Sequence, residues 1–419
     1  MSMILLYPKL QCEVGCAYCF GAPTKFLPYD KEKMAETLRN IVEQEKQNKH
    51  GSQVCLHGGE VCKLPIEDFE FFIKETRNLG IIPSIMTSTY GMTSEHIRMF
   101  KFYNIGVGVS LDGPPELNIL RGPRDPDKNK VFQQEVQAKL KMLKEARIPY
   151  GTITVLTKIN AVKENLDILL QWAKDNRIEG RFNPVFSPNF SIHTRGLELT
   201  AEEAKIAWIK LADLALETGQ NILPIREFMD NLLGYSYGPC WTARCDYATS
   251  IVKLILPTGQ VSTCDRCLQD GVRYREENYY ELRSQNLRHT DCKGCKYFEI
   301  CGGGCPGETI DRDPRNKSRY CEAAYGLYSH LEKKMRGMFP QIFLPGVDEA
   351  EWYKKSHDPK TSSTKPIWFK KMDNSSWRSR RYAIVGDNRN NKRNIQSKKP
   401  KETVNQEGGY CLAHCDGWS

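Results

Sequence analysis

Short apolar runs alternate with longer amphipathic stretches through the first 186 residues of the chain. Runs rich in apolar and β-branched residues are typical of buried strands, whereas apolar residues spaced three or four apart are typical of helices. Strand followed by helix at this cadence implies a parallel sheet with right-handed crossovers, so six repeats predict an α/β fold, a partial (β/α)6 barrel of TIM type. The pattern predicts strands at residues 4–7, 53–56, 81–86, 106–110, 151–155 and 181–185, and helices at 31–49, 66–79, 94–102, 129–146 and 163–176.

The pattern of apolar residues and the composition of the chain change after residue 190. Two further helices, at 201–218 and 225–233, lead into a segment, 239–321, that carries Cys, Gly, Asp and Pro without long apolar runs. A segment with so small a core needs cross-links, which its cysteines can supply through metal. A helix at 323–336 closes the folded part, and the polar residues beyond 357 bury too little apolar surface to order the chain. The predicted units are a partial barrel at 1–190, a helical linker at 191–236, a small cysteine-rich domain at 237–340 and a largely irregular, disordered tail at 341–419.

The charge of the chain is concentrated in its tail. The chain has 419 residues, which is long enough for more than one folded unit, and its formal charge is +9. Residues 354–419 hold 15 of the 60 Lys and Arg and 6 of the 51 Asp and Glu, which leaves 45 of each in the preceding part. A neutral body argues against a nucleic-acid groove, and the basic tail is interpreted as a solvated linker.

No stretch approaches the roughly 18 apolar residues of a membrane span, and the N-terminal segment lacks the features of a signal peptide. We therefore expect a cytoplasmic protein with no membrane partner. Cellular thiol pools keep cysteines reduced in that compartment, so the 16 cysteines are interpreted first as metal ligands.

Three closely spaced cysteines follow the first predicted strand. Cys12, Cys16 and Cys19 form a CxxxCxxC set. Three thiolates can each hold one iron of a four-iron cluster and leave the fourth iron open for chemistry. A closed zinc site is the alternative, but it needs a fourth Cys or His, and the loop contains none. Loops at the C-terminal ends of strands carry the active sites of barrel folds, so this position indicates a catalytic cluster.

The segment CEVGCAYCF, with Tyr18 and Phe20 flanking the third cysteine, resembles the cluster motif of the radical S-adenosylmethionine (SAM) superfamily. The resemblance covers about residues 3–186. It implies that SAM chelates the open iron and is cleaved reductively to a 5′-deoxyadenosyl radical that abstracts hydrogen.

Later strand ends resemble SAM-binding segments of the same family. The HGGE sequence ending at Glu60 resembles the GGE motif, although Val61 stands where the family usually has Pro, and VSLDGP followed by Arg121 resembles a segment of peptide-modifying members. The resemblance implies that glycine backbone and the Glu60 carboxylate receive the SAM amino group, and that Arg121 pairs with the SAM carboxylate. An exposed turn carboxylate and a surface ion pair are the alternatives for Glu60 and Arg121. The implied SAM contacts are Gly58, Gly59, Glu60, Ser88, Ser110 and Arg121.

A second pattern of seven cysteines runs from Cys245 to Cys321, and its spacings resemble the SPASM extension of radical SAM enzymes, with Cys240 as an eighth thiol. The resemblance implies two auxiliary [4Fe-4S] clusters, and hence three clusters in all, with a pair of zinc sites as the alternative. It assigns Cys240, Cys245, Cys264 and Cys305 to the cluster nearer the active site, and Cys292, Cys295, Cys301 and Cys321 to the outer one.

An auxiliary cluster near the substrate can accept the electron that remains after hydrogen abstraction. Asp265, directly after Cys264, resembles the general base of sulfatase-maturing relatives, with an exposed turn aspartate as the alternative. Cys267, two residues further on, is a weaker candidate for facing substrate. Of the other cysteines, Cys55 is interpreted as a small core residue, and Cys62 is given no role.

The last residues, EGGYCLAHCDGWS, look like the leader-to-core junction of a ribosomally made modified peptide. Residues 402–419 are therefore interpreted as a possible fused substrate, with an incidental C-terminus as the alternative.

The sequence thus predicts a radical SAM/SPASM oxidoreductase that introduces a thioether or cyclophane-type cross-link into a Cys- or aromatic-containing peptide. Its partners would be a peptide or protein substrate, with its own tail as one candidate, and an external electron donor such as a flavodoxin or ferredoxin. A sulfatase-maturing, formylglycine-generating enzyme is the enzymatic alternative. A non-catalytic iron–sulfur scaffold or electron carrier is the alternative from another class, and it would not cleave SAM.

Overall fold

A computed structural model of the chain describes residues 2–10, 12–19, 28–186, 194, 196–233, 252–262, 279–313 and 315–338. Its centre is a nine-stranded sheet with the order β7-β6-β5-β4-β3-β2-β1-β8-β9, in which every neighbouring pair except β8 and β9 is parallel. The six predicted strands are all confirmed, each within two residues. They are β1 (Ser2–Leu6), β2 (Ser52–Leu56), β3 (Pro83–Thr87), β4 (Gly106–Ser110), β5 (Tyr150–Leu156) and β6 (Gly180–Pro184).

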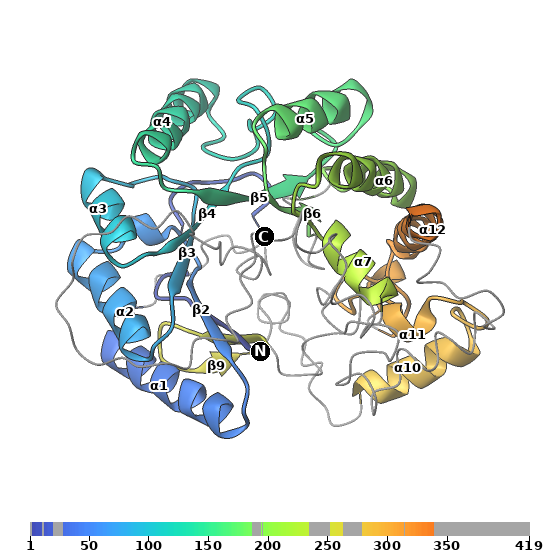
Figure 1. The fold of residues 1–419 in the computed structure, drawn as a ribbon, viewed down its shortest axis with the longest axis horizontal. Helices are drawn as coiled ribbons and strands as arrows, with labels where there is room; N and C mark the ends of the chain where they lie inside the picture. Colours follow the sequence, from blue (N-terminus) through green and yellow to red (C-terminus); the bar gives the residue numbers. More distant parts are fainter. Residues whose placement is uncertain are drawn as a thin grey trace.

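The helices between the strands form the outer layer of the barrel (Figure 1). Their buried residues recur at helical spacing, as in Met34, Leu38 and Ile41 of the first helix, and pack against the sheet. The predicted helices are confirmed within three residues. The helices of this layer are α1 (Lys31–Gln47), α2 (Ile66–Asn78), α3 (Ser94–Phe102), α4 (Pro126–Glu145), α5 (Lys163–Asp175) and α6 (Ala201–Thr218), with a short 3-10 helix η1 (Val61–Lys63) after β2.

Three strands at the edges of the sheet were not predicted. β7 (Ile222–Leu223) extends the sheet beyond β6, while β8 (Val252–Ile255) lies parallel to β1 and pairs with β9 (Val261–Ser262). They have two to four residues each, which is too short to show a periodic pattern. The sheet therefore draws on the chain on both sides of the predicted domain boundary at residue 236.

The C-terminal part of the described chain packs beside the barrel. α7 (Ile225–Leu232) and α12 (Cys321–Met338) lie together with α6 (Figure 1). The rings of Phe228 and Tyr328 are 4.5 Å apart, and Asn231 Nδ2 donates to the Tyr328 hydroxyl at 3.1 Å. Between these helices, the chain forms α10 (Tyr279–His289), α11 (Phe298–Cys301) and the 3-10 helix η2 (Ile310–Arg312).

Among the described residues, no helix combines the length and apolar character that crossing a membrane requires.

Candidate active site

The CxxxCxxC loop begins just after β1, at the C-terminal end of the barrel. Two backbone bonds hold it: Cys19 N donates to Cys16 O at 3.2 Å, and Ala17 N donates to Leu120 O at 2.8 Å. The second bond ties the loop to the segment between β4 and α4. Cys12 and Cys16 pack against the apolar cluster that includes Val14. The sheet thus brings the first cysteine motif beside the SLDGP segment, as parallel strand ends require.

The three thiols of this loop influence one another. Burial raises the pKa of Cys12 far above its usual value, and the charges of Glu60, Cys16 and Cys19 raise it further. Burial also raises the pKa of Cys16, while the Arg121 cation and a backbone N–H of Gly122 oppose that rise. Thiols in this setting ionise only when a strong cationic partner compensates them, which is what iron provides.

No three Cys, His, Asp or Glu side chains of the described ranges converge tightly enough to hold a single metal ion. A four-iron cluster makes a different demand, because each thiolate binds its own iron and the ligands stay farther apart.

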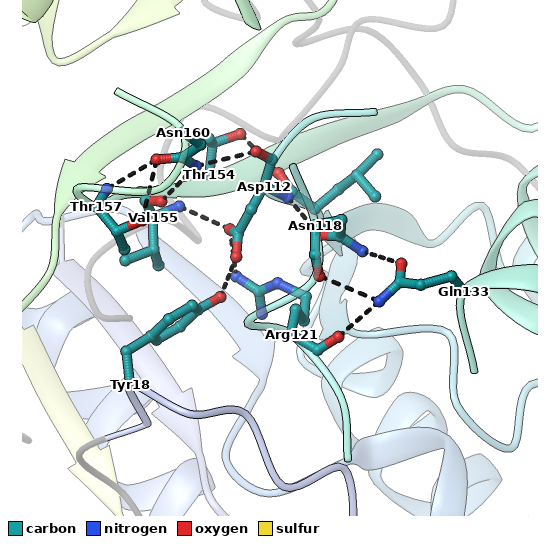
Figure 2. A network of polar contacts seen from close by, with 10 residues as sticks. Tyr18, Asp112, Asn118, Arg121, Gln133, Thr154, Val155, Thr157 and Asn160 are labelled. Carbon is teal, nitrogen blue, oxygen red and sulfur yellow. Dashed lines mark hydrogen bonds and ion pairs between the residues drawn. The ribbon is translucent and has the colours of Figure 1, made fainter. Parts of the chain in front are cut away.

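A buried carboxylate, Asp112, organises the strand ends around the loop (Figure 2). Its Oδ1 accepts from Arg121 Nη2 and from Val155 N, both at 2.9 Å, and its Oδ2 accepts from the Tyr18 hydroxyl. Tyr18 comes from the cysteine loop, Arg121 from the segment before α4 and Val155 from β5. One carboxylate thereby joins three segments that are distant in the sequence.

The network continues behind Asp112. Asn160 Nδ2 donates to the Asp112 carbonyl at 3.0 Å, and Asn118 Oδ1 accepts from Asp112 N at 2.8 Å (Figure 2). Gln133 in α4 then donates to the carbonyls of Asn118 and Arg121 at 3.1 and 2.8 Å. These bonds connect the cysteine loop with the ends of β4 and β5 and with α4.

Arg121 is buried, which excludes the alternative of a surface ion pair. Its side chain is 6% exposed, it forms an ion pair with Asp112, and its guanidinium lies 5.4 Å from the centre of the Tyr18 ring. Burial lowers the pKa of Arg121, but the charges of Asp112, Tyr18 and Cys16 and the hydrogen bond to Asp112 together raise it by more, so the guanidinium stays charged. Its Nε is buried and has no hydrogen-bond partner within the described structure. That donor is available to an acceptor of a ligand.

Glu60 is buried rather than exposed, and protein donors surround its carboxylate. Oε1 accepts from Cys62 N at 3.0 Å and from Thr87 Oγ1 at 2.5 Å, while Oε2 accepts from the backbone N–H of Ser88 at 2.8 Å and from its hydroxyl. A carboxylate offers about four lone-pair positions, and these donors fill them. The contacts make Glu60 and Ser88 a brace between the ends of β2 and β3. Burial raises the pKa of Glu60, and the four hydrogen bonds oppose that rise.

The two glycines of the motif adopt left-handed backbone conformations, with φ of 78° at Gly58 and 55° at Gly59. A Cβ on Gly58 would lie 2.2 Å from the Tyr7 ring. Glycine is therefore required here for both conformation and space.

His57 is a site residue that the motif-based prediction omitted. Its ring stacks on Tyr7 at 5.1 Å, and its Nδ1 accepts from Gly58 N at 2.7 Å, which places the proton of the neutral ring on Nε2. Burial lowers the pKa of His57 to about 4. Nε2 is buried and has no partner among the described residues. A polar residue directly after a buried strand was the available sequence signal.

Asn183 in β6 is a second omitted residue. It is fully buried opposite Val155 in the sheet, and neither its amide nitrogen nor its amide oxygen finds a partner in the described part of the chain. Buried amides are almost always hydrogen-bonded, so a ligand or water should satisfy this one. Ser110, the last residue of β4, is also buried.

The described cysteines of the second pattern fall into two neighbourhoods. Burial raises the pKa of Cys301 to about 12, and the charges of Cys321, Cys292 and Cys295 add to the rise. Burial likewise raises the pKa of Cys292 to about 11, with contributions from Cys321 and Cys295. Cys305 instead accepts a hydrogen bond from Gly307 N at 3.3 Å, in a turn next to Phe186 at the end of the barrel sheet. Cys240, Cys245, Cys264, Asp265, Cys267 and residues 402–419 lie outside the described residues.

Comparison with known families decides what this barrel is. Residues 7–169 match the model of the radical SAM superfamily. The chain carries a radical SAM domain. That domain contains the cysteine loop, the Glu60 brace and the Asp112 network, and it ends within α5.

The similarity continues beyond the radical SAM domain. The chain is 24% identical to a cysteine-type anaerobic sulfatase-maturating enzyme of Clostridium novyi over 355 residues, which covers 77% of this chain and 93% of the relative. Among solved structures, anSMEcpe with bound AdoMet and the Cp18Cys peptide has a TM-score of 0.65 at 18% identity, covering 81% of this chain and 99% of that one. SuiB of Streptococcus suis bound to its precursor peptide SuiA has a TM-score of 0.52 at 19% identity, covering 77% and 75%. The shared fold thus extends beyond residues 7–169.

The residues of the radical SAM domain fit a SAM-bound cluster on chemical grounds. Three buried or half-buried thiols lie next to a buried cation whose Nε is unpartnered in the described structure, and the glycine turn sits at the adjacent strand end. The thiols complement an iron–sulfur cluster, the arginine complements an anionic carboxylate, and the glycine turn complements an ammonium group.

Proposed function

We propose that this protein is a peptide-modifying radical SAM maturase with two auxiliary iron–sulfur clusters. The observation that carries the proposal is the position of Cys12, Cys16 and Cys19, next to the buried Asp112–Arg121 pair at one end of the barrel. The relatives named above, which match over most of both chains, support action on a peptide.

Within this proposal, Cys12, Cys16 and Cys19 hold the SAM cluster, and the backbone of Gly58 and Gly59, together with the Glu60 carboxylate, receives the SAM amino group. Ser88 and Ser110 are proposed as further SAM contacts. Arg121 directs its Nε to the SAM carboxylate while Asp112 holds its Nη2. When bound, SAM and the clusters would supply a hydrogen-abstracting 5′-deoxyadenosyl radical and an acceptor for the electron left on the substrate. An external donor, such as a flavodoxin or ferredoxin, provides the electron for SAM cleavage.

Asp265 is proposed to take the proton that substrate oxidation releases, because a carboxylate beside a cluster ligand can act as a general base. Cys240, Cys245, Cys264 and Cys305 are proposed to hold the inner auxiliary cluster. Cys292, Cys295, Cys301 and Cys321 are proposed to hold the outer one, and their mutual charge effects support this grouping.

The proposed product is a thioether or cyclophane-type cross-link, and residues 402–419 are a candidate substrate segment because they combine Cys, Tyr, His and Trp. The second candidate reaction is conversion of a cysteine in another protein to formylglycine. It is favoured by the similarity to a cysteine-type sulfatase-maturating enzyme.

The first experiment is anaerobic incubation with SAM and reductant, followed by trypsin digestion and mass spectrometry of residues 402–419, which contain no Lys or Arg. Loss of two hydrogens that persists after thiol reduction and blocks alkylation would establish a thioether. The same loss with both thiols alkylatable would establish a carbon–carbon cross-link. An unchanged tail together with an aldehyde in an added cysteine peptide would select the formylglycine reaction.

The enzyme class is tested by replacing Cys12, Cys16 and Cys19 with Ala. This triple variant should form no 5′-deoxyadenosine. Cys62→Ala is the matched control, because Cys62 is a buried thiol near the site with no assigned iron. Persistent SAM cleavage in the triple variant would refute the proposal.

A further inference from the structure

The glycines between Cys301 and Cys305 form an unusual turn. Gly302, Gly303 and Gly304 are consecutive and all left-handed, with φ of 61°, 84° and 75°. Successive left-handed residues curl the backbone and direct its carbonyl groups toward one side. Only glycine adopts this conformation readily at three positions in a row.

One buried arginine of α10 takes up all three carbonyls of this turn. Arg283 Nη1 donates to the carbonyls of Gly302 and Gly304, and Nη2 donates to that of Gly303, each at 3.1 Å. Nη2 also donates to the carbonyl of Asn316 at 2.8 Å. Arg283 is 3% exposed. A planar guanidinium with fixed donors can span such a ring of acceptors, which a lysine ammonium cannot.

The same helix also contacts the segment that contains Cys292. Leu287 lies one turn after Arg283, and its carbonyl accepts a hydrogen bond from Cys292 N at 2.8 Å. Its side chain packs against Gly303 so closely that a Cβ on this glycine would lie 2.4 Å from Leu287 Cδ1. α10 therefore contacts both the Cys301–Cys305 turn and the Cys292 segment.

The turn joins two thiols. Cys301 packs against the same large apolar cluster as Cys305, and the Cys305 sulfur accepts a hydrogen bond from Gly307 N beside Phe186. Under the proposed function, on which this step rests, Cys301 and Cys305 belong to different auxiliary clusters. The position of one sulfur atom relative to the other then depends on the conformation of the turn.

We propose that Arg283 is a positioning residue that holds the Cys301–Cys305 turn, and thereby sets the placement of both auxiliary clusters. Its cationic charge has a second effect. A four-iron cluster with four thiolates is anionic and gains negative charge on reduction, so a buried cation nearby favours the reduced form.

The test uses Arg283→Met and Arg283→Lys, each made in the background of the Cys12, Cys16 and Cys19 to Ala variant, where any iron left is auxiliary. The parent background should hold about eight irons in two clusters after anaerobic reconstitution. Arg283→Met should lose at least half of that iron, and Arg283→Lys should lose less. Clusters that remain should have midpoint potentials more negative than those of the parent.

The matched control is Arg288→Met on the same helix. Arg288 is half exposed and pairs with Glu299, so its loss should leave iron content, electron paramagnetic resonance spectra and potentials unchanged. To exclude general misfolding, Arg283→Met is also made with the first cysteine motif intact, where it should still cleave SAM with a strong reductant.

Two results would overturn the inference in distinguishable ways. If the parent background holds about eight irons and Arg283→Met matches it in iron, spectrum and potential, Arg283 has no positioning role. If the parent background binds no iron, the auxiliary clusters of the proposed function are absent and the inference fails with them.

Discussion

Two buried arginines hold two loops of this protein in different ways. In the barrel, Arg121 is neutralised by the carboxylate of Asp112. In the cysteine-rich part, Arg283 binds backbone carbonyls of the glycine turn and of Asn316. Carbonyl dipoles satisfy the hydrogen-bond donors of the guanidinium and thereby tie it to the backbone of the turn.

The comparison extends to the surroundings of each arginine. The barrel has a large apolar core between sheet and helices, so its active-site loop is held by ordinary folding forces. In the cysteine-rich part, Leu287, Cys292 and Phe298 form a small separate cluster, whereas the apolar residues of α12 pack into the large core that they share with the barrel. We infer that the barrel and α12 fold without iron, whereas the segment from α10 to Phe298 depends on it.

The largest expected effect is that of iron removal. Anaerobic chelation should expose residues 279–298 to limited proteolysis and leave residues 28–186 protected, as mass spectrometry of the fragments will show. Equal protection of both regions after complete removal of iron would contradict the contrast between them.

Within the barrel, the ion pair should be the most sensitive point. Asp112→Asn leaves the Arg121 cation buried without its counter-charge, and should lower the free energy of unfolding by about 3–5 kcal/mol in urea titrations. Asp167→Asn, which breaks the exposed ion pair with Lys210, is the control and should change it by less than about 1 kcal/mol. Similar losses in the two variants would show that burial of the pair does not matter.

Acid should weaken the barrel through its buried histidines. Burial, with a contribution from Lys139, lowers the pKa of His96 from 6.5 to about 4. The unfolded chain therefore binds more protons between pH 6.5 and 4, and stability falls as the pH falls through this window, by about 3 kcal/mol for one such group. His96→Gln should flatten the pH dependence of unfolding measured over that range, leaving the contribution of His57. An unchanged slope would show that His96 is charged in the folded protein.

A smaller effect is expected from Tyr18→Phe, which removes the hydroxyl that donates to Asp112 and keeps the ring over Arg121. Hydrogen bonds to charged groups contribute about 2 kcal/mol, so chemical denaturation should show a loss of that size. A loss as large as that of Asp112→Asn would mean that the hydroxyl, rather than the arginine, is the main partner of the carboxylate.

Sequence periodicity was a reliable guide where the elements are long. The helix at 94–102 and the strand at 106–110 coincide with α3 and β4, because their apolar positions repeat often enough to identify them. The edge strands β7, β8 and β9 were missed, since two to four residues carry no period and their pairing depends on strands far away in the sequence.

The spacing of the cysteines, the glycine motif and the alternation of strands and helices determined the fold class and the domain family of this protein, because local patterns along the chain encode them. Only the tertiary structure decided that Glu60 braces Ser88, that Arg121 is buried against Asp112, and that Arg283 binds the glycine turn. Hydrogen-bond partners of this kind lie 9 to 28 residues apart in the sequence. They follow from the packing of whole elements, which brings buried polar groups together and requires each to find a partner.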